Sequence, residues 1–202
     1  MTPTRLPTGL DGLDGRLGGG VAAGALVALT APPDSGSERL CYALAAANDA
    51  RYLSTFRPAD EVRAVLDAHP GEVSVEQTPA DALLESPGET LDGLDLDGSA
   101  VVVDTATELE RAGRDQYRRA LDVLKRRLRA TGSVALLHCQ DVEPAPMRRG
   151  LTLGRADVTL RLRFTGFPER LDPRLYVTKH RGGPSPDEAI PLAFAGRGVE
   201  VR

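Results

Sequence analysis

The sequence predicts an α/β fold built on a mainly parallel sheet, because patterns of buried strands and of helices alternate along the chain. Three continuous apolar runs, at residues 24–30, 99–105 and 133–139, are typical of strands that are covered on both faces. Amphipathic helix patterns lie between these runs. Residues 156–164 and 174–181 instead alternate between apolar and polar side chains, which predicts antiparallel strands with one exposed face.

The composition is that of an ordinary soluble globular protein. Hydrophobic residues make up 41% of the chain and charged residues 27%. Aromatic residues are scarce at 4%, which argues against base stacking as a main binding device. The net charge of −4 gives no global attraction to nucleic acid or to an anionic membrane. We expect one domain over residues 1–202, with a glycine-rich leading segment at 1–24, an α/β core at 25–155 and C-terminal strands at 156–202.

No targeting, disulfide or metal-binding pattern stands out. The two cysteines, Cys41 and Cys139, lie far apart, and the three histidines are scattered. We therefore expect buried thiols that act as small hydrophobic groups, and no metal site. The first residues are polar, and no apolar run approaches membrane-spanning length. These features predict a cytoplasmic protein with no membrane partner.

The remaining elements follow from local patterns and turn residues. Residues 5–24 are dense in glycine and aspartate, which predicts a loop with one short helical turn. Residues 85–98 are acidic and turn-rich, and Gly93 stands where an EF-hand needs its first ligand, which favours a solvated acidic loop over a calcium site. The other expected elements are a strand at 51–56, a helix from 58, a strand at 73–78, a short helix from 79, a helix at 114–129, a loop at 141–155 and strands within 190–202.

One stretch carries a phosphate-binding pattern. Residues 24–39 comprise an apolar run, a turn rich in proline, glycine and serine, and an amphipathic helix. This architecture holds phosphates with backbone N–H groups and a helix N-terminus. The consensus G-x-x-x-x-G-K-[ST] aligns with residues 31–38, here APPDSGSE, so the second glycine is kept whereas the lysine and the Mg²⁺-binding hydroxyl are replaced. The candidate cofactor-binding residues are Pro33, Asp34, Ser35, Gly36, Ser37, Glu38 and Arg39.

The replacements disfavour a nucleotide. Relative to a typical G-P-P-G-S-G-K-T loop, Asp34, Ser37 and Glu38 each lower the charge by one unit. One like-charge pair at about 4 Å costs about 4 kcal/mol at an effective dielectric constant of roughly 20. Loss of the lysine removes a charge-assisted hydrogen bond worth roughly 1.5–3 kcal/mol. Arg39 is the only adjacent cation, so the sequence predicts weak or no binding of ATP and Mg²⁺ and indicates no other cofactor.

The segment ahead of this loop resembles a known superfamily. Residues 8–24 read TGLDGLDGRLGGGVAAG and lead directly into the strand and loop, which is similar to the start of RecA/KaiC-type P-loop ATPases, including archaeal RadA and its paralogues. Residues 156–158 (ADV), 179–182 (KHRG) and 190–192 (IPL) resemble the closing strands of that superfamily, in the same order. The resemblance covers nearly all of the chain and implies a RecA-like P-loop NTPase fold in a degenerate, archaeal-type relative.

The resemblance implies four elements of an ATPase site, of which two are present. The phosphate loop is altered, and Phe56 and Arg57 replace the glutamate pair that would polarise the attacking water. Asp104 stands at the Walker-B position. Lys179 and Arg181 match a Lys-x-Arg pair that, in ring-forming members, reaches the γ-phosphate of a neighbouring subunit. Because phosphoryl transfer depends on positioning and electrostatics, hydrolysis should be slower by several orders of magnitude.

Ordinary structural roles are the alternative for these residues. Asp104 would then be a polar group at a strand end, and Lys179 and Arg181 would belong to the exposed face of an edge strand. His138, at the end of a buried strand, is expected to be a hydrogen-bonded core histidine or a sensor.

Basic residues gather in two places. The helix at 114–129 carries seven basic and two acidic residues on its outer face, and Arg148 and Arg149 lie where RecA-like proteins place a DNA-facing loop. Either feature suits nucleic acid or an acidic protein partner. A solvated helix face is the alternative.

Three functions remain open. The first is a pseudo-ATPase with a regulatory or scaffold role, acting through a protein partner or self-association. The second is an active ATPase of DNA repair, recombination or signalling, with Glu38 or Asp104 on Mg²⁺ and Arg39 on phosphate. The third is a DNA-binding accessory factor with salt-dependent affinity. We expect the first, because both the phosphate loop and the catalytic base are lost.

Overall fold

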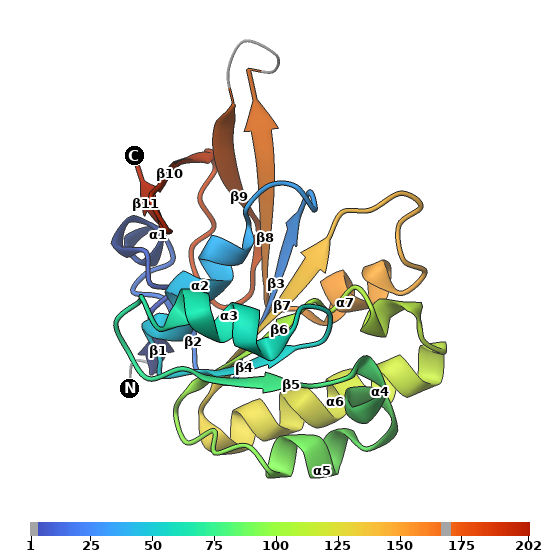
Figure 1. Ribbon diagram of the computed structural model, residues 1–202. Helices are drawn as coiled ribbons and strands as arrows, with labels where there is room; N and C mark the ends of the chain where they lie inside the picture. Colours follow the sequence, from blue (N-terminus) through green and yellow to red (C-terminus); the bar gives the residue numbers. More distant parts are fainter. Residues whose placement is uncertain (1–3, 167–170) are drawn as a thin grey trace.

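A computed structural model of the protein describes residues 4–166 and 171–202. Its main feature is a central sheet with helices on both faces (Figure 1). The strands of this sheet are β3 Leu26–Ala31, β4 Arg51–Ser54, β5 Ser74–Gln77, β6 Ala100–Asp104, β7 Val134–Gln140, β8 Val158–Thr165, β9 Asp172–His180, β10 Ile190–Ala195 and β11 Gly198–Val201. Across the described residues they lie in the order β11-β10-β9-β8-β3-β7-β6-β4-β5.

The sheet changes from parallel to antiparallel at β8. Strand β3 pairs in parallel with β7 and with β8, and β6 and β4 continue the parallel part to β5. Strands β9, β10 and β11 are each antiparallel to the strand before them. A separate antiparallel pair is formed by β1 Arg5–Leu6 and β2 Val21–Ala22. The predicted fold class, a mainly parallel sheet with antiparallel C-terminal strands, is confirmed.

Helices cover both faces of the parallel part, and each face has its own hydrophobic core. The helices are α1 Asp11–Arg16, α2 Glu38–Ala46, α3 Ala59–Leu66, α4 Ala80–Glu85, α5 Pro87–Asp92, α6 Arg114–Thr131 and α7 Arg149–Arg155, with a 3₁₀ turn at Leu109–Arg111. Helices α1, α2 and α3 pack on one face, and α4, α5 and α6 on the other. Because side chains alternate along a strand, Leu26 of β3 faces α6 whereas Val27 faces the α1–α3 side.

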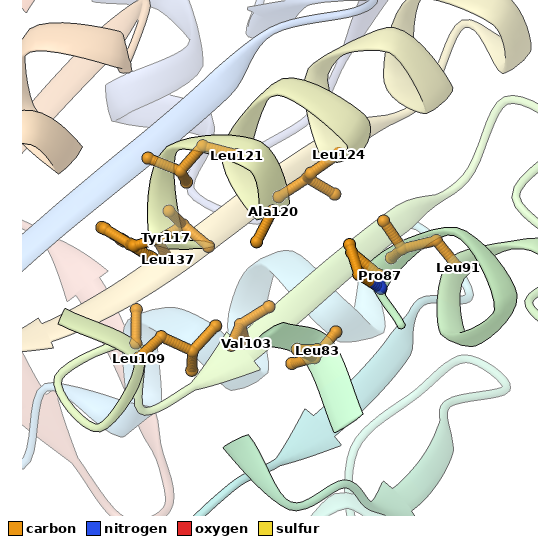
Figure 2. Close-up of a pocket in the computed structure, with 11 residues that line it drawn as sticks. Leu83, Pro87, Leu91, Val103, Leu109, Tyr117, Ala120, Leu121, Leu124 and Leu137 are labelled. Carbon is orange, nitrogen blue, oxygen red and sulfur yellow. The ribbon is translucent and has the colours of Figure 1, made fainter. Parts of the chain in front are cut away.

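Helix α6 is the long amphipathic helix that the sequence predicts. Its apolar side chains Tyr117, Leu121, Leu124 and Leu128 are buried. The helix ends at Gly132, whose φ of 69° is the left-handed conformation that glycine adopts most easily. Together with α4, α5 and β6, α6 encloses an apolar cavity of about 20 Å³ (Figure 2). The lining has almost no polar surface, so this cavity belongs to the core and offers nothing to bind a polar ligand.

The predicted loop at residues 85–98 is wrong, because part of it forms α5. Pro87 occupies the first helical position, where no backbone donor is needed. Leu91, Leu94 and Leu96 are buried in the core beneath α6. In the sequence these leucines lie among acidic and turn-forming residues, so the pattern did not indicate that they belong to the core.

The predicted loop at residues 141–155 is also wrong at its C-terminal half, where α7 forms. Arg149 and Thr152, one turn apart on this helix, are both buried. A buried arginine at the start of a helix needs an acidic partner, which comes from a distant part of the chain. Within the described residues, no helix has the length and apolar character that crossing a membrane requires.

Candidate functional site

The loop between β3 and α2 keeps the backbone shape of an anion cradle. Gly36 has φ 66°, and Ser37 after it is in the right-handed helical region and caps α2. Within the described part of the chain, the backbone N–H groups of Gly36, Ser37 and Glu38 donate no hydrogen bond. Successive free N–H groups in this left-handed, right-handed sequence form a concavity that suits an anion. The loop backbone therefore has a shape and free donors that suit an anion.

The side chains around this loop form a buried chain of hydrogen bonds, here called the polar network: Ser37, His138, Asp104 and Tyr52. Ser37 Oγ lies 2.8 Å from His138 Nε2, and His138 Nδ1 lies 2.7 Å from Asp104 Oδ1. Tyr52 donates from its hydroxyl to the other carboxylate oxygen, Asp104 Oδ2, at 2.6 Å. Ser37 is 2% exposed, and His138 and Asp104 are each 4% exposed.

The strand order brings these four residues together from distant parts of the sequence. Asp104 ends β6 and pairs in register with His138 of β7, while Tyr52 lies on β4, the other neighbour of β6. Strand β3, which leads into Ser37, is the other neighbour of β7. Because the carboxyl ends of parallel strands meet at one edge of the sheet, all four side chains gather there.

The charges in the polar network are fixed by burial and hydrogen bonding. Burial opposes ionisation of Asp104, but the hydrogen bond and electrostatic interaction with His138, the hydrogen bond from Tyr52 and the charge of Arg57 outweigh it and lower the pKa of this carboxyl. Burial, together with the charge of Asp104, raises the pKa of Tyr52 well above its usual value, so the phenol stays neutral. Because an ionised Asp104 can only accept a hydrogen bond, we assign a proton to the His138 nitrogen that faces it, Nδ1. In the tautomer with its proton on Nδ1, Nε2 accepts from the Ser37 hydroxyl.

The two residues that the sequence aligns with the phosphate-loop lysine and the Walker-B carboxylate, Ser37 and Asp104, both contact His138. Both Asp104 oxygens accept hydrogen bonds from the polar network. Arg39, the adjacent cation, lies with its guanidinium carbon 5.3 Å from the centre of the Phe194 ring, within the range of a cation–π contact. The carboxylates of Asp34, which is exposed, and Glu38, which is partly exposed, form no ion pair within the described residues.

The region after β4 carries no carboxylate pair at the expected place. Phe56 is 68% exposed, and Arg57 donates to the Tyr42 hydroxyl at 2.6 Å. The nearest carboxylates in sequence begin α3, where Asp60 accepts from the backbone of its neighbour and Glu61 lies 3.9 Å from Arg57.

Lys179 and Arg181 do not reach the cradle of their own chain. Lys179 pairs with Thr159 next to the start of β3, whereas the loop follows the end of β3. Lys179 Nζ donates to the carbonyl of Leu153 at 2.6 Å, and Arg181 donates to the carbonyl of Gly154 at 3.0 Å. In this chain both side chains hold the C-terminal end of α7.

Arg149 is not available to a DNA backbone in this structure, because its guanidinium is buried. Its Nε lies 2.9 and 2.8 Å from the two carboxylate oxygens of Glu110, which is fully buried. Asp141 accepts from the same guanidinium at 3.0 Å. Arg148, the preceding residue, donates to the carbonyl of Ala112 at 3.2 Å.

Sequence reasoning missed the way the site is assembled. His138 was expected to be a hydrogen-bonded core histidine or a sensor, and both of its ring nitrogens have partners. Nothing in the sequence marked Tyr52 or Glu110 as members of polar clusters. Their partners lie 52 and 39 residues away, so no local pattern could have joined them.

Comparison with known proteins places the chain in a family and supports its fold. A search of curated proteins found no match. Among solved structures, the KaiC-like protein PH0186 from the hyperthermophilic archaeon Pyrococcus horikoshii OT3 is similar with a TM-score of 0.80. The two chains share 16% identity, and the match covers 99% of each, so this likeness establishes a RecA/KaiC-like fold. The model of a family of unknown function, DUF7125, matches residues 5–201, and the chain therefore belongs to that family.

Proposed function

We propose that this chain is a RecA/KaiC-like pseudo-ATPase: a cytoplasmic regulatory or scaffold protein that acts through a protein partner or another copy of itself. We also propose that residues 1–202 form one domain. The observation that carries it is the polar network, in which Ser37 and Asp104, the residues expected beside a phosphate and a metal, already have a protein partner in His138.

A metal at Asp104 would have to displace existing partners. Each carboxylate oxygen accepts a hydrogen bond, one from His138 and one from Tyr52. Hydrogen bonds to a charged group are worth roughly 1.5–3 kcal/mol each, so an incoming Mg²⁺ must offset both. No hydroxyl replaces the missing Mg²⁺ ligand at position 38, where a glutamate stands.

The charges around the cradle add to this penalty. Asp34 and Glu38 would face a triphosphate as like charges, and such pairs cost about 4 kcal/mol at about 4 Å and an effective dielectric constant of roughly 20. Arg39 would have to leave the Phe194 ring to compensate. The free N–H groups alone then have to hold the phosphates.

Calorimetric titration with ATP and Mg²⁺, followed by a single-turnover hydrolysis assay, tests the proposal. We expect no binding by the wild type at micromolar ATP, and micromolar binding by Ser37→Lys/Glu38→Thr, because the backbone cradle is retained. Asp95→Asn/Asp97→Asn, which adds the same two units of charge on an exposed loop, should behave as the wild type. Micromolar affinity or hydrolysis in the wild type would contradict the proposal.

A second candidate, binding of an anionic partner such as DNA, is favoured by a basic groove. The groove has a volume of about 270 Å³ and lies where α6 meets the end of β9. Arg126 and Arg129 are exposed there and form no ion pair in the described part of the chain. The residues that line it are Asp122, Lys125, Arg126, Arg129, Arg155 and Arg181.

Fluorescence anisotropy with a labelled DNA duplex at several salt concentrations tests this candidate. Phosphate contacts make affinity fall with salt, and Arg126→Gln/Arg129→Gln should reduce the logarithmic salt slope by about one unit per lost contact. Arg114→Gln/Arg118→Gln, at the other end of α6, is the control that should leave the slope unchanged. Absence of salt-dependent binding in the wild type would exclude DNA as a partner.

A further inference from the structure

We infer that Ser37, His138 and Asp104 form a nucleophilic triad that acts on short, neutral carboxylic esters. The inference concerns an activity separate from the proposed loss of ATP hydrolysis. Two short contacts carry the inference: Ser37 Oγ lies 2.8 Å from His138 Nε2, and His138 Nδ1 lies 2.7 Å from Asp104 Oδ1. These are the distances that join a hydroxyl nucleophile to its general base, and that base to its orienting carboxylate.

The direction of the hydrogen bonds suits proton transfer from Ser37. Asp104 accepts from the Nδ1–H of His138 and so orients the imidazole with Nε2 toward the serine hydroxyl, where the Nδ1–H tautomer can take up its proton. Tyr52 donates to the second oxygen of Asp104, which fixes the carboxylate in the plane that orients the imidazole. Asp104 and Tyr52 are thus positioning residues, and Ser37 and His138 are the catalytic ones.

The cradle supplies donors for the oxyanion of an acyl-transfer reaction. The backbone N–H groups of Ser37 and Glu38 are free within the described residues and begin α2, a nine-residue helix. Donors on the nucleophile and on the residue after it lie next to the carbon that Oγ attacks. The positive end of the helix dipole adds to their effect on the developing negative charge.

The reaction balances with the substrate and water alone. Ser37 Oγ forms a bond to the ester carbonyl carbon while His138 Nε2 takes the hydroxyl proton. The ester C–O bond then breaks, and the proton passes from Nε2 to the leaving alkoxide or phenoxide. Water, deprotonated by the same Nε2, attacks the acyl-serine, releasing the acid and restoring the Ser37 hydroxyl.

The surroundings of the loop select the substrate class. Asp34 and Glu38 flank the cradle with negative charge, which disfavours anionic acyl groups. The Phe194 ring lies 3.9 Å from the point where a Cβ on Gly36 would stand, so one wall beside the loop is apolar. Because Ser37 is almost fully buried, bulky acyl groups are excluded, and the inference is restricted to short ones.

Covalent labelling with methanesulfonyl fluoride, a small sulfonylating reagent, tests the triad, because such reagents modify serines that have a general base. We expect peptide mapping of the labelled wild type to find the adduct on Ser37, a result that needs no variant. With p-nitrophenyl acetate, the wild type should release a burst of one p-nitrophenolate per chain. Ser37→Ala should lose both signals.

Two further variants separate a base-assisted reaction from simple exposure of a serine. His138→Gln should slow labelling of Ser37 by about 100-fold or more, the usual contribution of a general base. The control variant is Ser54→Ala, which removes an equally buried serine whose hydroxyl donates to the carbonyl of Arg57. In this variant Ser37 should be labelled at the wild-type rate. Circular dichroism of each variant checks that the fold is kept.

The inference is overturned if Ser37 of the folded wild type stays unmodified, if the adduct lies on another residue, or if a folded His138→Gln variant is labelled at the wild-type rate. None of these results depends on nucleotide binding, so the pseudo-ATPase proposal stands or fails on its own titration.

Discussion

Asp104 is a buried carboxylate whose hydrogen-bond partners are protein side chains. It ends a buried parallel strand, and both of its carboxylate oxygens accept hydrogen bonds. An ionised carboxylate this deeply buried is tolerated only with such partners. The charge of Asp104 therefore depends on His138 and Tyr52, and the charge of Asp104 in turn helps to keep Tyr52 neutral.

Stability should depend on pH through this residue. The pKa of Asp104 is lowered in the folded state from its usual 3.8, so its contribution to stability is fully present above that value and is lost as the pH falls through the lower folded-state pKa. Urea unfolding of the wild type and of Asp104→Asn between pH 7 and pH 3 should give a difference in unfolding free energy that shrinks below about pH 4.

The control for this measurement is Asp97→Asn, which changes an exposed aspartate. A difference between wild type and Asp104→Asn that stays constant over the whole pH range would show that the pKa of Asp104 is the same in the folded and the unfolded protein.

At the scale of elements, α7 illustrates how a polar contact can fix a short helix. Glu110 is fully buried and receives both the Arg149 guanidinium and the Thr152 hydroxyl from α7. Asp141 then joins Arg149 to Arg163 on β8, at 3.0 and 2.5 Å. This short helix is thereby tied to the core at its first turn, although few of its side chains are apolar.

Arg149→Met should destabilise the protein by about 3–5 kcal/mol, because it leaves the Glu110 carboxylate buried without its partner. The matched change at the adjacent residue, Arg148→Met, should cost well under half as much. Urea unfolding measures both.

A double variant, Glu110→Gln/Arg149→Met, removes both charges and should recover a large part of the loss. Equal effects of Arg148→Met and Arg149→Met would contradict the view that the Glu110 pair holds α7.

At the scale of the whole molecule, opposite charges lie at opposite edges of the parallel sheet. The loop with Asp34 and Glu38 follows the end of β3, and the basic groove with Arg181 lies near its start, where the backbone of Arg181 bonds to Asp157 and that of Asp157 to Leu26. The modest net charge of the sequence hides this separation. Only the fold shows that an anion would meet attraction at one edge and repulsion at the other.

Much of the fold could be predicted from the sequence, because the signals were local. Continuous apolar runs marked the buried parallel strands, and the 4-3-4 spacing from Tyr117 to Leu128 marked α6. Helices α5 and α7 escaped, since Leu91 and Arg149 owe their burial to partners from other elements.

The candidate site was predictable only in part. The altered phosphate loop and Asp104 could be read from motif and position, but the bonding of Ser37 to His138 depends on β7 lying between β3 and β6. No local pattern encodes that order.

We propose that hydrogen bonds within the polar network engage Ser37 and Asp104, the residues that would otherwise face a phosphate and its metal. A crystal structure determined with a non-hydrolysable ATP analogue and Mg²⁺ in excess tests it most directly. We predict that Ser37 Oγ remains about 2.8 Å from His138 Nε2 and that Asp104 keeps both hydrogen bonds, with no metal beside it. A metal bound to Asp104, with His138 turned away and phosphates seated over residues 35–38, would contradict the account.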